Sequence, residues 1–306
     1  MIEQLAMLFG VGLPFLGLIA AVGLAWGRGV GWVDLLLLIG FYCFTILGVT
    51  IGFHRMFTHR ALSSGPVVRF VLAVAGSMSG QGSVLEWCAI HREHHKHSDR
   101  EGDPHSPHLH DGGFVGMVRG MMHAHFGWLF SHNDPPANTV VADLLADPVL
   151  RLVDRLFWLW MPLGWLLPAV IAGLIFHTWT AALGGLIWGG LVRQFLLHHV
   201  TWSINSVCHI WGRRTFATPD HSRNNVVFGV LAFGEGWHNN HHAFPTSARH
   251  GLRWWQVDIT YWLICGMKAV GLAWDVRVPT AAAIEAKRQS AMATPRAGSR
   301  ATASAV

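Results

Sequence analysis

The hydrophobic residues of this chain fall into four long runs that polar segments separate. Each run reaches the roughly 20 residues that an α-helix needs to cross a bilayer core of about 30 Å. The fourth run is interrupted by Arg193, His198 and His199. Short turns at 27–31 and 177–178 join the runs in pairs, so we expect two membrane-spanning helical hairpins. The predicted spans cover 5–26, 33–53, 156–176 and 179–202.

A fifth apolar segment, 66–85, is harder to place because it contains Arg69, Gln81 and several Gly and Ser residues. If this segment crossed the membrane, the histidine pair before it and the histidine cluster after it would lie on opposite sides. A helix that lies in the membrane interface keeps the two groups of histidines together. We therefore predict an interfacial helix at 66–85.

The composition supports a membrane location. Hydrophobic residues make up 52% of the chain and charged residues 13%, about half of the roughly 25% that is typical of soluble domains. The net charge of +5 does not indicate a nucleic-acid partner, because the arginines are scattered and no nucleic-acid-binding motif is present. The four cysteines form no CxxC pair, which is typical of a reducing compartment. We expect an integral protein of the lipid bilayer.

Basic residues predict the orientation in the membrane. All 22 Lys and Arg residues except Arg28 and Arg193 lie in 55–155 or from 213 onward. By the positive-inside rule these regions are cytoplasmic, and so are both termini. We expect a single membrane domain over 1–280, in a bacterial inner or plasma membrane. Residues 281–306, rich in Ala, Ser and Arg, are expected to form a disordered tail.

Four motifs concentrate histidines on the predicted cytoplasmic side. Residues three or four apart share one face of an α-helix, so each HxxHH motif should bring three imidazoles together. Five residues at about 100° each leave the ends of an HxxxxH motif about 140° apart, so these two should reach different metals or straddle a helix end. The motifs are His54-Arg-Met-Phe-Thr-His59, His91-Arg-Glu-His94-His95, Asn205-Ser-Val-Cys-His209 and His238-Asn-Asn-His241-His242.

The nine imidazoles of these motifs are more than one metal ion needs. A closed structural zinc site takes about four ligands, so nine histidines predict two metals with four or five ligands each. Imidazole suits Zn, Cu, Fe and Ni alike and does not choose between them. Histidines outside the motifs, including His105 and His250, are expected to have interfacial, core or supporting roles.

The order of these motifs, combined with two membrane hairpins, resembles the membrane fatty-acid desaturase family. The flanks resemble its acyl-CoA and acyl-lipid Δ9 branch, the stearoyl-CoA type: Gly236-Trp237 before and Ala243-Phe244-Pro245 after the last motif, Thr201-Trp202 before Asn205, and Glu86-Trp87 before His91. The resemblance covers about 33–274. His198 and His199 depart from the animal acyl-CoA enzymes, so the acyl carrier stays open between CoA and a glycerolipid.

This resemblance implies an all-α fold of four spans with a cytoplasmic helical cap that holds a di-iron site. The two non-haem irons would be held by the nine histidines, with Asn205 reaching one of them through a water molecule. The implied reaction uses dioxygen to introduce a cis double bond, Δ9 by analogy, into a saturated long-chain acyl group. Iron fits this chemistry because zinc has no redox activity.

The resemblance also implies an apolar tunnel with a bend beside the metals. It places Gln81, Trp87, Thr201 and Trp202 near that bend. From the helix face that carries His54, we expect the tunnel to be closed near Ile39, Tyr42 or Cys43. Each ligand histidine should donate its other N–H to an acceptor, for which Glu235, Asp99 and Asp103 are candidates.

The electrons should come from another protein. The sequence contains no GxGxxG fingerprint, no CxxC iron–sulfur pattern and no fused haem domain, so we expect a ferredoxin-like or cytochrome-type donor with its reductase. Two alternatives remain: a related di-iron hydroxylase or ketolase, and a metal transporter. A transporter should carry polar ligands at the bilayer midplane, whereas these histidines lie at or beyond the ends of the spans.

Overall fold

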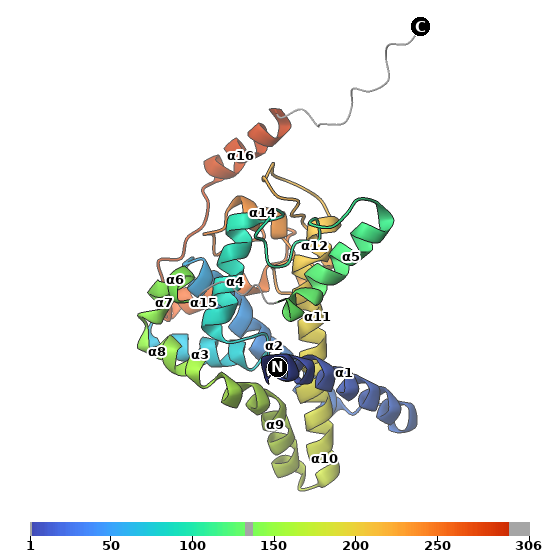
Figure 1. The fold of residues 1–306 in the computed structure, drawn as a ribbon. Helices are drawn as coiled ribbons and strands as arrows, with labels where there is room; N and C mark the ends of the chain where they lie inside the picture. The colour runs from blue at the N-terminus through green and yellow to red at the C-terminus, as the bar shows by residue number, and fades with distance from the viewer. Residues whose placement is uncertain (1, 132–136, 294–306) are drawn as a thin grey trace.

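The structure is a computed structural model that describes residues 2–131 and 137–293, and it is mostly helical (Figure 1). Two of its long helices change from α to π geometry along their length. Helix α2 (Trp32–Leu47) continues into the π-helix η1 (Gly48–Thr58), and α10 (Trp179–Gly184) continues through the π-helix η3 (Gly185–Val192) into α11 (Arg193–Asn205). The other two long helices are α1 (Ile2–Arg28) and α9 (Phe157–Phe176).

Four helices among the described residues are long and apolar enough to cross a membrane, as the sequence predicts. The candidate spans are Leu8–Gly27, Trp32–Thr58, Phe157–Phe176 and Trp179–Ile210. Arg193 does not interrupt the fourth span, because its buried guanidinium donates to the carbonyl oxygens of Met78 (3.1 Å) and Gly164 (2.8 Å). A charged group inside a span is tolerated when the protein itself supplies its partners.

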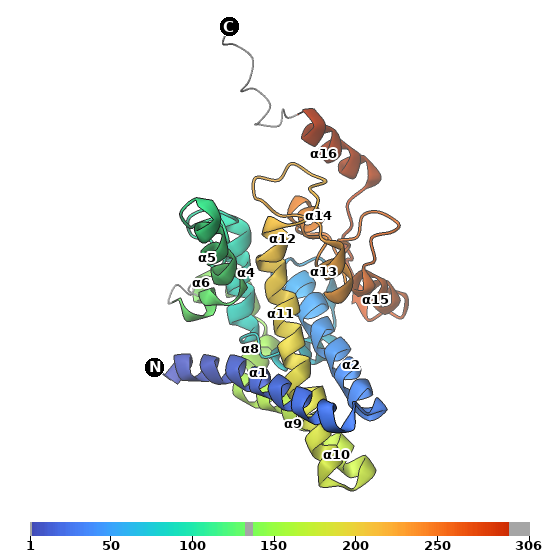
Figure 2. The same ribbon diagram turned by 90° about the vertical axis from the view of Figure 1, so that its right-hand side faces the viewer.

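The π-helix η3 lies at the centre of the long helices. Helices α1, α2 and α9 all pack against it, and α9 also packs against α10. A side chain at Gly185 would put its Cβ 2.4 Å from the carbonyl oxygen of Pro168, so glycine is needed for this close approach. Helix α1 runs slantwise across the other long helices and contacts η3 and α11 (Figure 2).

The shorter elements include those that carry the histidine motifs, which gather at the end of the molecule opposite the α9–α10 turn (Figures 1 and 2). Strands β1 and β2 form a two-stranded antiparallel sheet. The elements are β1 (Ser63–Ser64), α3 (Pro66–Ser77), α4 (Val84–His97), α5 (Gly113–His125), η2 (Gly127–Phe130), α6 (Ala137–Val140), α7 (Ala142–Leu145), α8 (Pro148–Arg155), α12 (Val207–Ile210), α13 (Val226–Leu231), α14 (His238–Ala243), α15 (Ile259–Ala269), β2 (Ala273–Trp274) and α16 (Ala281–Ala293).

The segment predicted as one interfacial helix at 66–85 is divided in the structure. Helix α3 ends at Ser77 after 12 residues, well short of the roughly 20 that cross a bilayer. The chain then turns through Gly80 (φ +71°) and Gly82 (φ +102°), a left-handed conformation that glycine adopts at little cost. Its placement in the membrane interface stays a prediction.

The tail also differs from the expectation of disorder from residue 281. Helix α16 covers Ala281–Ala293, and residues 294–306 lie outside the described part of the chain. The Nζ of Lys287 donates to the carbonyl oxygen of Ala243 and lies 4.7 Å from the ring centre of Phe244. These contacts attach α16 to the end of α14, a long-range interaction that the local composition does not reveal.

Candidate metal centre

The nine motif histidines form two neighbouring clusters. Within each cluster one nitrogen from every ring lies within 4.8 Å of the others. The five-histidine cluster contains His54, His59, His91, His95 and His241, and the four-histidine cluster contains His94, His209, His238 and His242. The expected division into four and five candidate ligands is present in the geometry.

The π-helix η1 explains why His54 and His59 share a cluster. In a π-helix the backbone hydrogen bond joins residues five apart, and here the N–H of His59 donates to the carbonyl oxygen of His54 (3.1 Å). Residues five apart are therefore one turn apart, and the two rings lie 4.8 Å from each other. The expectation that they reach different metals is wrong because it assumed α-helical geometry, although His59 does lie at the end of the helix.

Each HxxHH motif is divided between the two clusters. His91 and His95, one α-helical turn apart on α4, join the five-histidine cluster, whereas His94 joins the other. On α14 the pattern is reversed, because His241 alone reaches the five-histidine cluster. The expected convergence of all three imidazoles of a motif is wrong, since neighbouring residues on a helix point about 100° apart.

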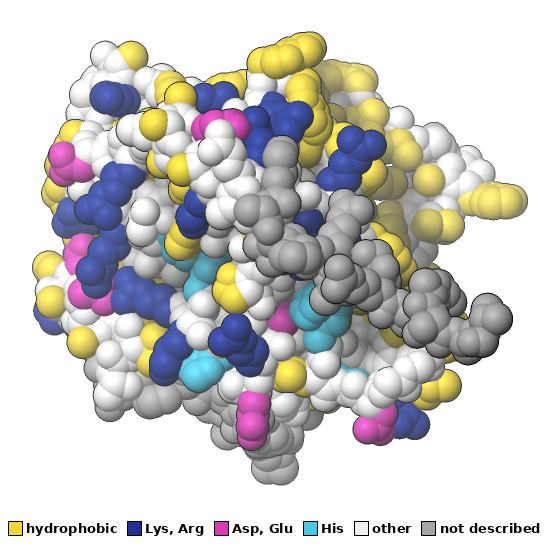
Figure 3. Space-filling model, turned by 90° about the horizontal axis from the view of Figure 1, so that it is seen from above, with side chains coloured by type: hydrophobic (Ala, Val, Ile, Leu, Met, Phe, Trp, Pro, Cys, Tyr) yellow, Lys and Arg dark blue, Asp and Glu magenta, His cyan; other side chains and the backbone are white. Residues whose placement is uncertain are grey.

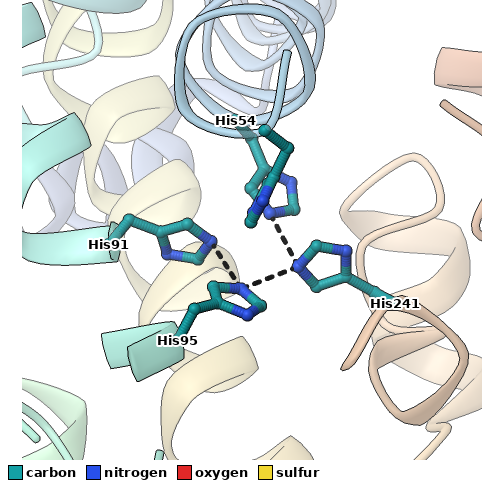
Figure 4. A group of neighbouring side chains, drawn as sticks. His54, His91, His95 and His241 are labelled. Atoms are coloured by element: carbon teal, nitrogen blue, oxygen red, sulfur yellow. Dashed lines mark hydrogen bonds between the residues drawn. The ribbon is translucent and has the colours of Figure 1, made fainter. Parts of the chain in front are cut away.

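Figure 4 shows four members of the five-histidine cluster converging from three helices. His54 comes from η1, His91 and His95 come from α4, and His241 comes from α14. The Nε2 of His241 lies 3.1 Å from Nε2 of His54 and 2.9 Å from Nε2 of His95. Segments that are far apart in the sequence thus bring the Nε2 atoms of their histidines close together.

Carboxylates hold the opposite ring nitrogen of four of these histidines. Three of them are the carboxylates named from the sequence: Glu235 lies 2.6 Å from Nδ1 of His54, Asp103 lies 2.9 Å from Nδ1 of His94, and Asp99 lies 2.8 Å from Nδ1 of His209. The fourth, Asp220, lies 3.0 Å from Nδ1 of His242 and was missed. Its segment has no periodic pattern that could have indicated the contact.

The carboxylate contacts at Nδ1 show whether the histidine clusters fit a metal ion. A neutral imidazole has a single N–H, and a carboxylate at Nδ1 requires that proton there. In the neutral form Nε2 then carries a lone pair, and the buried Nε2 of His94 has no hydrogen-bond partner among the described residues. A buried lone pair without a donor matches a bound cation. Both clusters fit a metal bound by imidazole alone and supported by carboxylates.

Protonation favours the same interpretation. Burial lowers the pKa of His91, His95, His238 and His241 well below the usual 6.5, so these rings are neutral at pH 7. Burial alone would raise the pKa of Asp103, but its contact with His94 lowers the pKa overall. Burial alone would lower the pKa of His94, but Asp103 raises it overall, so His94 would have to release its extra proton on binding a metal. The four rings with lowered pKa are already in the neutral form that binds a metal.

Further residues lie around the two clusters, and of these Arg55 and Asp258 were not predicted. The buried guanidinium of Arg55 donates to Glu235 (Nε to Oε1, 3.2 Å) and pairs with Asp258 at 2.9 Å. His250 lies 3.2 Å from Glu235 through its Nδ1. Near the other cluster, the ring of His105 lies 4.4 Å from the ring of His94. His105 and His250 therefore lie beside the clusters, in the supporting positions that are among those expected for histidines outside the motifs.

An inner cavity of about 70 Å³ reaches the clusters, with His54, His91 and His238 in its wall. Four of the predicted tunnel residues and Asn205 line it; these are Gln81, Trp87, Thr201 and Trp202. Ile39, Tyr42 and Cys43 lie outside this cavity, and Ile39 is 57% exposed on α2. The role of these three in closing a tunnel stays a prediction.

A larger outer cavity of about 400 Å³ adjoins the inner one. The two cavities share Gln81, Ile90, Trp128 and Trp202 in their walls. Gly10 and Val11 of α1 line the outer cavity together with Phe157, Trp158 and Met161 of α9. The approach to the candidate metal centre therefore lies between two of the candidate spans.

Apolar spans and paired histidine clusters beside a cavity define a membrane metalloprotein. The family model for fatty acid desaturases matches residues 30–267, and the chain belongs to this family. It is 42% identical over 278 residues to the hex-5-enoyl-(acyl-carrier protein) acetylenase of Moorena producens (strain JHB), covering 90% of this chain and 87% of that protein.

Other relatives are named for different activities. The chain is 38% identical over 237 residues to the sn-1 stearoyl-lipid 9-desaturase of Anabaena variabilis, covering 76% of this chain and 79% of that protein. It is 37% identical over 261 residues to the chloroplastic palmitoyl-monogalactosyldiacylglycerol delta-7 desaturase of Arabidopsis thaliana, covering 82% and 64%. Family membership and the four apolar helices together indicate an integral membrane oxidoreductase of lipid metabolism.

Proposed function

We propose that this chain is an oxygen-dependent desaturase that introduces a cis double bond, at Δ9, into a saturated long-chain fatty acyl group. The observation that carries the proposal is the pair of all-imidazole clusters, backed by carboxylates, with members in the wall of an inner cavity. Two iron ions held by the nine histidines would supply, with dioxygen, the oxidising power that an unactivated methylene pair requires. Zinc could not supply it.

The residues of the chain position the reaction. Glu235, Asp99 and Asp103 hold the Nδ1–H of their histidines, so the Nε2 lone pairs stay aimed at the metal positions. Asn205, in the wall of the inner cavity, would reach one iron through a water molecule. These fixed orientations leave little reorganisation for the reaction itself.

The substrate is held by the two cavities. The acyl chain would enter through the outer cavity and place one carbon pair beside the histidines, between Trp87, Thr201 and Trp202 of the inner cavity. The tryptophan side chains of the inner cavity would restrict the chain, and an error of about 1 Å in such positioning is costly. If Cys43 closes the tunnel, Cys43→Trp shifts the preference to shorter acyl chains.

The position of the double bond is the finer part of the proposal. The relatives are named for positions 9, 7 and 5, and Δ9 rests on the stearoyl-lipid 9-desaturases together with the flanking motifs. The carrier is an acyl-lipid or acyl-CoA. The 42% identity with the acetylenase favours a second candidate, formation of a triple bond on an acyl chain bound to an acyl-carrier protein.

The reaction needs two electrons from another protein, a ferredoxin-like or cytochrome-type donor with its reductase. The distribution of Lys and Arg supports a cytoplasmic location for the histidine clusters and both termini, in a bacterial inner or plasma membrane.

The decisive experiment is expression in a host that lacks Δ9 desaturase activity, followed by mass spectrometry of fatty-acid methyl esters. We expect a new cis-Δ9 monoenoic acid of about 16–18 carbons, the chain length that the family resemblance implies. A dominant hydroxy acid would favour the hydroxylase alternative, and an acetylenic product would favour the second candidate. An unchanged profile with bound iron and an effective donor would contradict the proposal. His95→Ala provides the inactive control.

A further inference from the structure

An arginine-rich pocket lies on the histidine-bearing end of the molecule, apart from the two cavities. It encloses about 450 Å³. The four arginines in its wall come from three separate segments, and they are Arg213, Arg214, Arg253 and Arg288. Helix α16 supplies the last of them. Figure 3, which looks down on this end, shows Lys and Arg side chains spread over the face with histidines visible between them.

Three of the four arginines in this pocket have no carboxylate partner among the described residues. No Asp or Glu lines the pocket. Among the described residues, Arg213, Arg214 and Arg253 form no ion pair, and Arg288 pairs only with Glu285 of its own helix at 3.1 Å. Like charges that share a pocket repel one another, so the arrangement suits an anionic partner that binds from solution.

The wall of the pocket includes the residue that precedes a member of the four-histidine cluster. Trp237, which is buried, lines the pocket and directly precedes His238 in the chain. The ring of Trp255 meets the ring of Trp237 edge to face at 5.5 Å, and Trp255 is 41% exposed. An aromatic contact and a covalent link therefore connect the surface of the pocket to a candidate metal ligand.

The pocket is separate from the acyl site. It shares no wall residue with the inner or the outer cavity. A negatively charged acyl carrier bound here would have no direct entry for its acyl chain. An electron carrier needs only close contact with a conducting route, which the two tryptophans offer.

We propose that this pocket docks a small acidic one-electron carrier protein and that electrons pass through Trp255 and Trp237 to His238. The inference rests on the proposed function. Two reduced carriers each lose one electron; these two electrons, two protons and the two hydrogens of the acyl CH₂–CH₂ group reduce O₂ to two waters and leave CH=CH. The arginines raise the encounter rate by long-range attraction, which salt weakens.

Docking is tested by binding, without turnover. The probe is a plant-type 2Fe–2S ferredoxin, titrated against the purified full-length protein in detergent at low salt. We expect the triple variant Arg213→Gln/Arg214→Gln/Arg253→Gln to raise Kd about tenfold, and salt to raise the wild-type Kd. Arg100→Gln/Arg119→Gln/Lys268→Gln removes the same charge from positions outside the pocket and should change Kd less than twofold. Equal losses in both sets, or no loss in the triple variant, overturn the proposal.

The route is tested by rapid anaerobic mixing of reduced ferredoxin with the oxidised iron-loaded protein. Trp255→Leu should slow ferredoxin oxidation about tenfold while Kd stays within twofold. The matched control is Trp254→Leu, because Trp254 is 94% exposed and lies outside the pocket. Equal rates in the two variants overturn the route.

If the charge variants raise KM for the acyl substrate and not for ferredoxin, the pocket serves an acyl carrier and the inference is wrong. An absence of desaturated product would contradict the proposed function alone, since the binding measurement needs no product.

Discussion

At the scale of single residues, carboxylates decide how the histidines of the two clusters are oriented. Asp99, Asp103 and Asp220 each accept from the Nδ1 of a different histidine in the four-histidine cluster. The sequence predicts the first two, since they follow the second motif closely. It does not predict Asp220, which contacts His242 of α14 from a segment 22 residues earlier, beyond helix α13. A contact between a loop and a helix depends on the tertiary fold and leaves no periodic trace.

Removal of Asp220 should weaken the metal site. Asp220→Ala leaves the Nδ1 of His242 without its acceptor, and we expect iron affinity to fall about 10–100-fold. Iron content after dialysis against a graded chelator series measures this. Asp111→Ala, at an exposed position, is the control and should retain the wild-type iron content. Equal iron in both variants would contradict the supporting role of Asp220.

Removal of Arg55 should destabilise the fold itself. Arg55→Met leaves Glu235 and Asp258 buried without their shared cation, at a cost of about 3–5 kcal/mol in the free energy of unfolding. Arg60→Met breaks an exposed pair with Asp143 and should cost about 0–1 kcal/mol. Thermal unfolding in detergent compares the two, and similar losses would show that Arg55 has no special role.

At the scale of elements, π-geometry is what the sequence could not predict. The spans and the motifs follow from hydrophobic length and spacing, but the α-helical angle between His54 and His59 does not hold along η1. Glycines let η1 lie against α3, because a Cβ at Gly48 would stand 2.2 Å from the backbone nitrogen of Gly76. Packing of this kind depends on a partner helix, so a local pattern cannot show which hydrogen-bond register the backbone adopts.

A side chain at this contact should disturb the five-histidine cluster. Gly48→Ala forces η1 away from α3, and we expect a loss of about 1–3 kcal/mol in stability together with reduced iron content. Gly40→Ala on α2 has open space around its new methyl group and provides the matched control. The measurements are thermal unfolding and iron analysis. Equal stability and equal iron content in Gly48→Ala and Gly40→Ala would contradict the prediction.

At the scale of the whole molecule, the route to the candidate metal centre passes between membrane helices. The four spans could be predicted from composition and length, but the slant of α1 across η3 and the cavity that it helps to enclose could not. Those features arise where Gly10 and Val11 face α9. Family membership is clear from the histidine motifs, whereas the substrate depends on the shape of this cavity.

Narrowing the outer cavity should hinder substrate binding. Val11 lines this cavity, so Val11→Trp fills part of the space for the acyl chain. We expect KM for the acyl substrate to rise about tenfold, because the displaced chain loses apolar contacts that contribute roughly 1.4 kcal/mol to binding. Iron content should be unchanged. Ile19→Trp, on the same helix and 53% exposed, should leave KM near the wild-type value. A normal KM for Val11→Trp would show that the acyl chain enters elsewhere.

Helices α4 and α14 each contribute histidines to both clusters, and this affects the order in which the two metal centres fill. Each helix supplies both clusters, so a metal ion in one of them immobilises side chains that belong to the other. The second ion then meets ligands whose freedom is already reduced, which makes loading cooperative. Native mass spectrometry during an Fe(II) titration should therefore show chiefly empty and doubly loaded protein. A dominant singly loaded species at half saturation would mean that the two centres assemble independently.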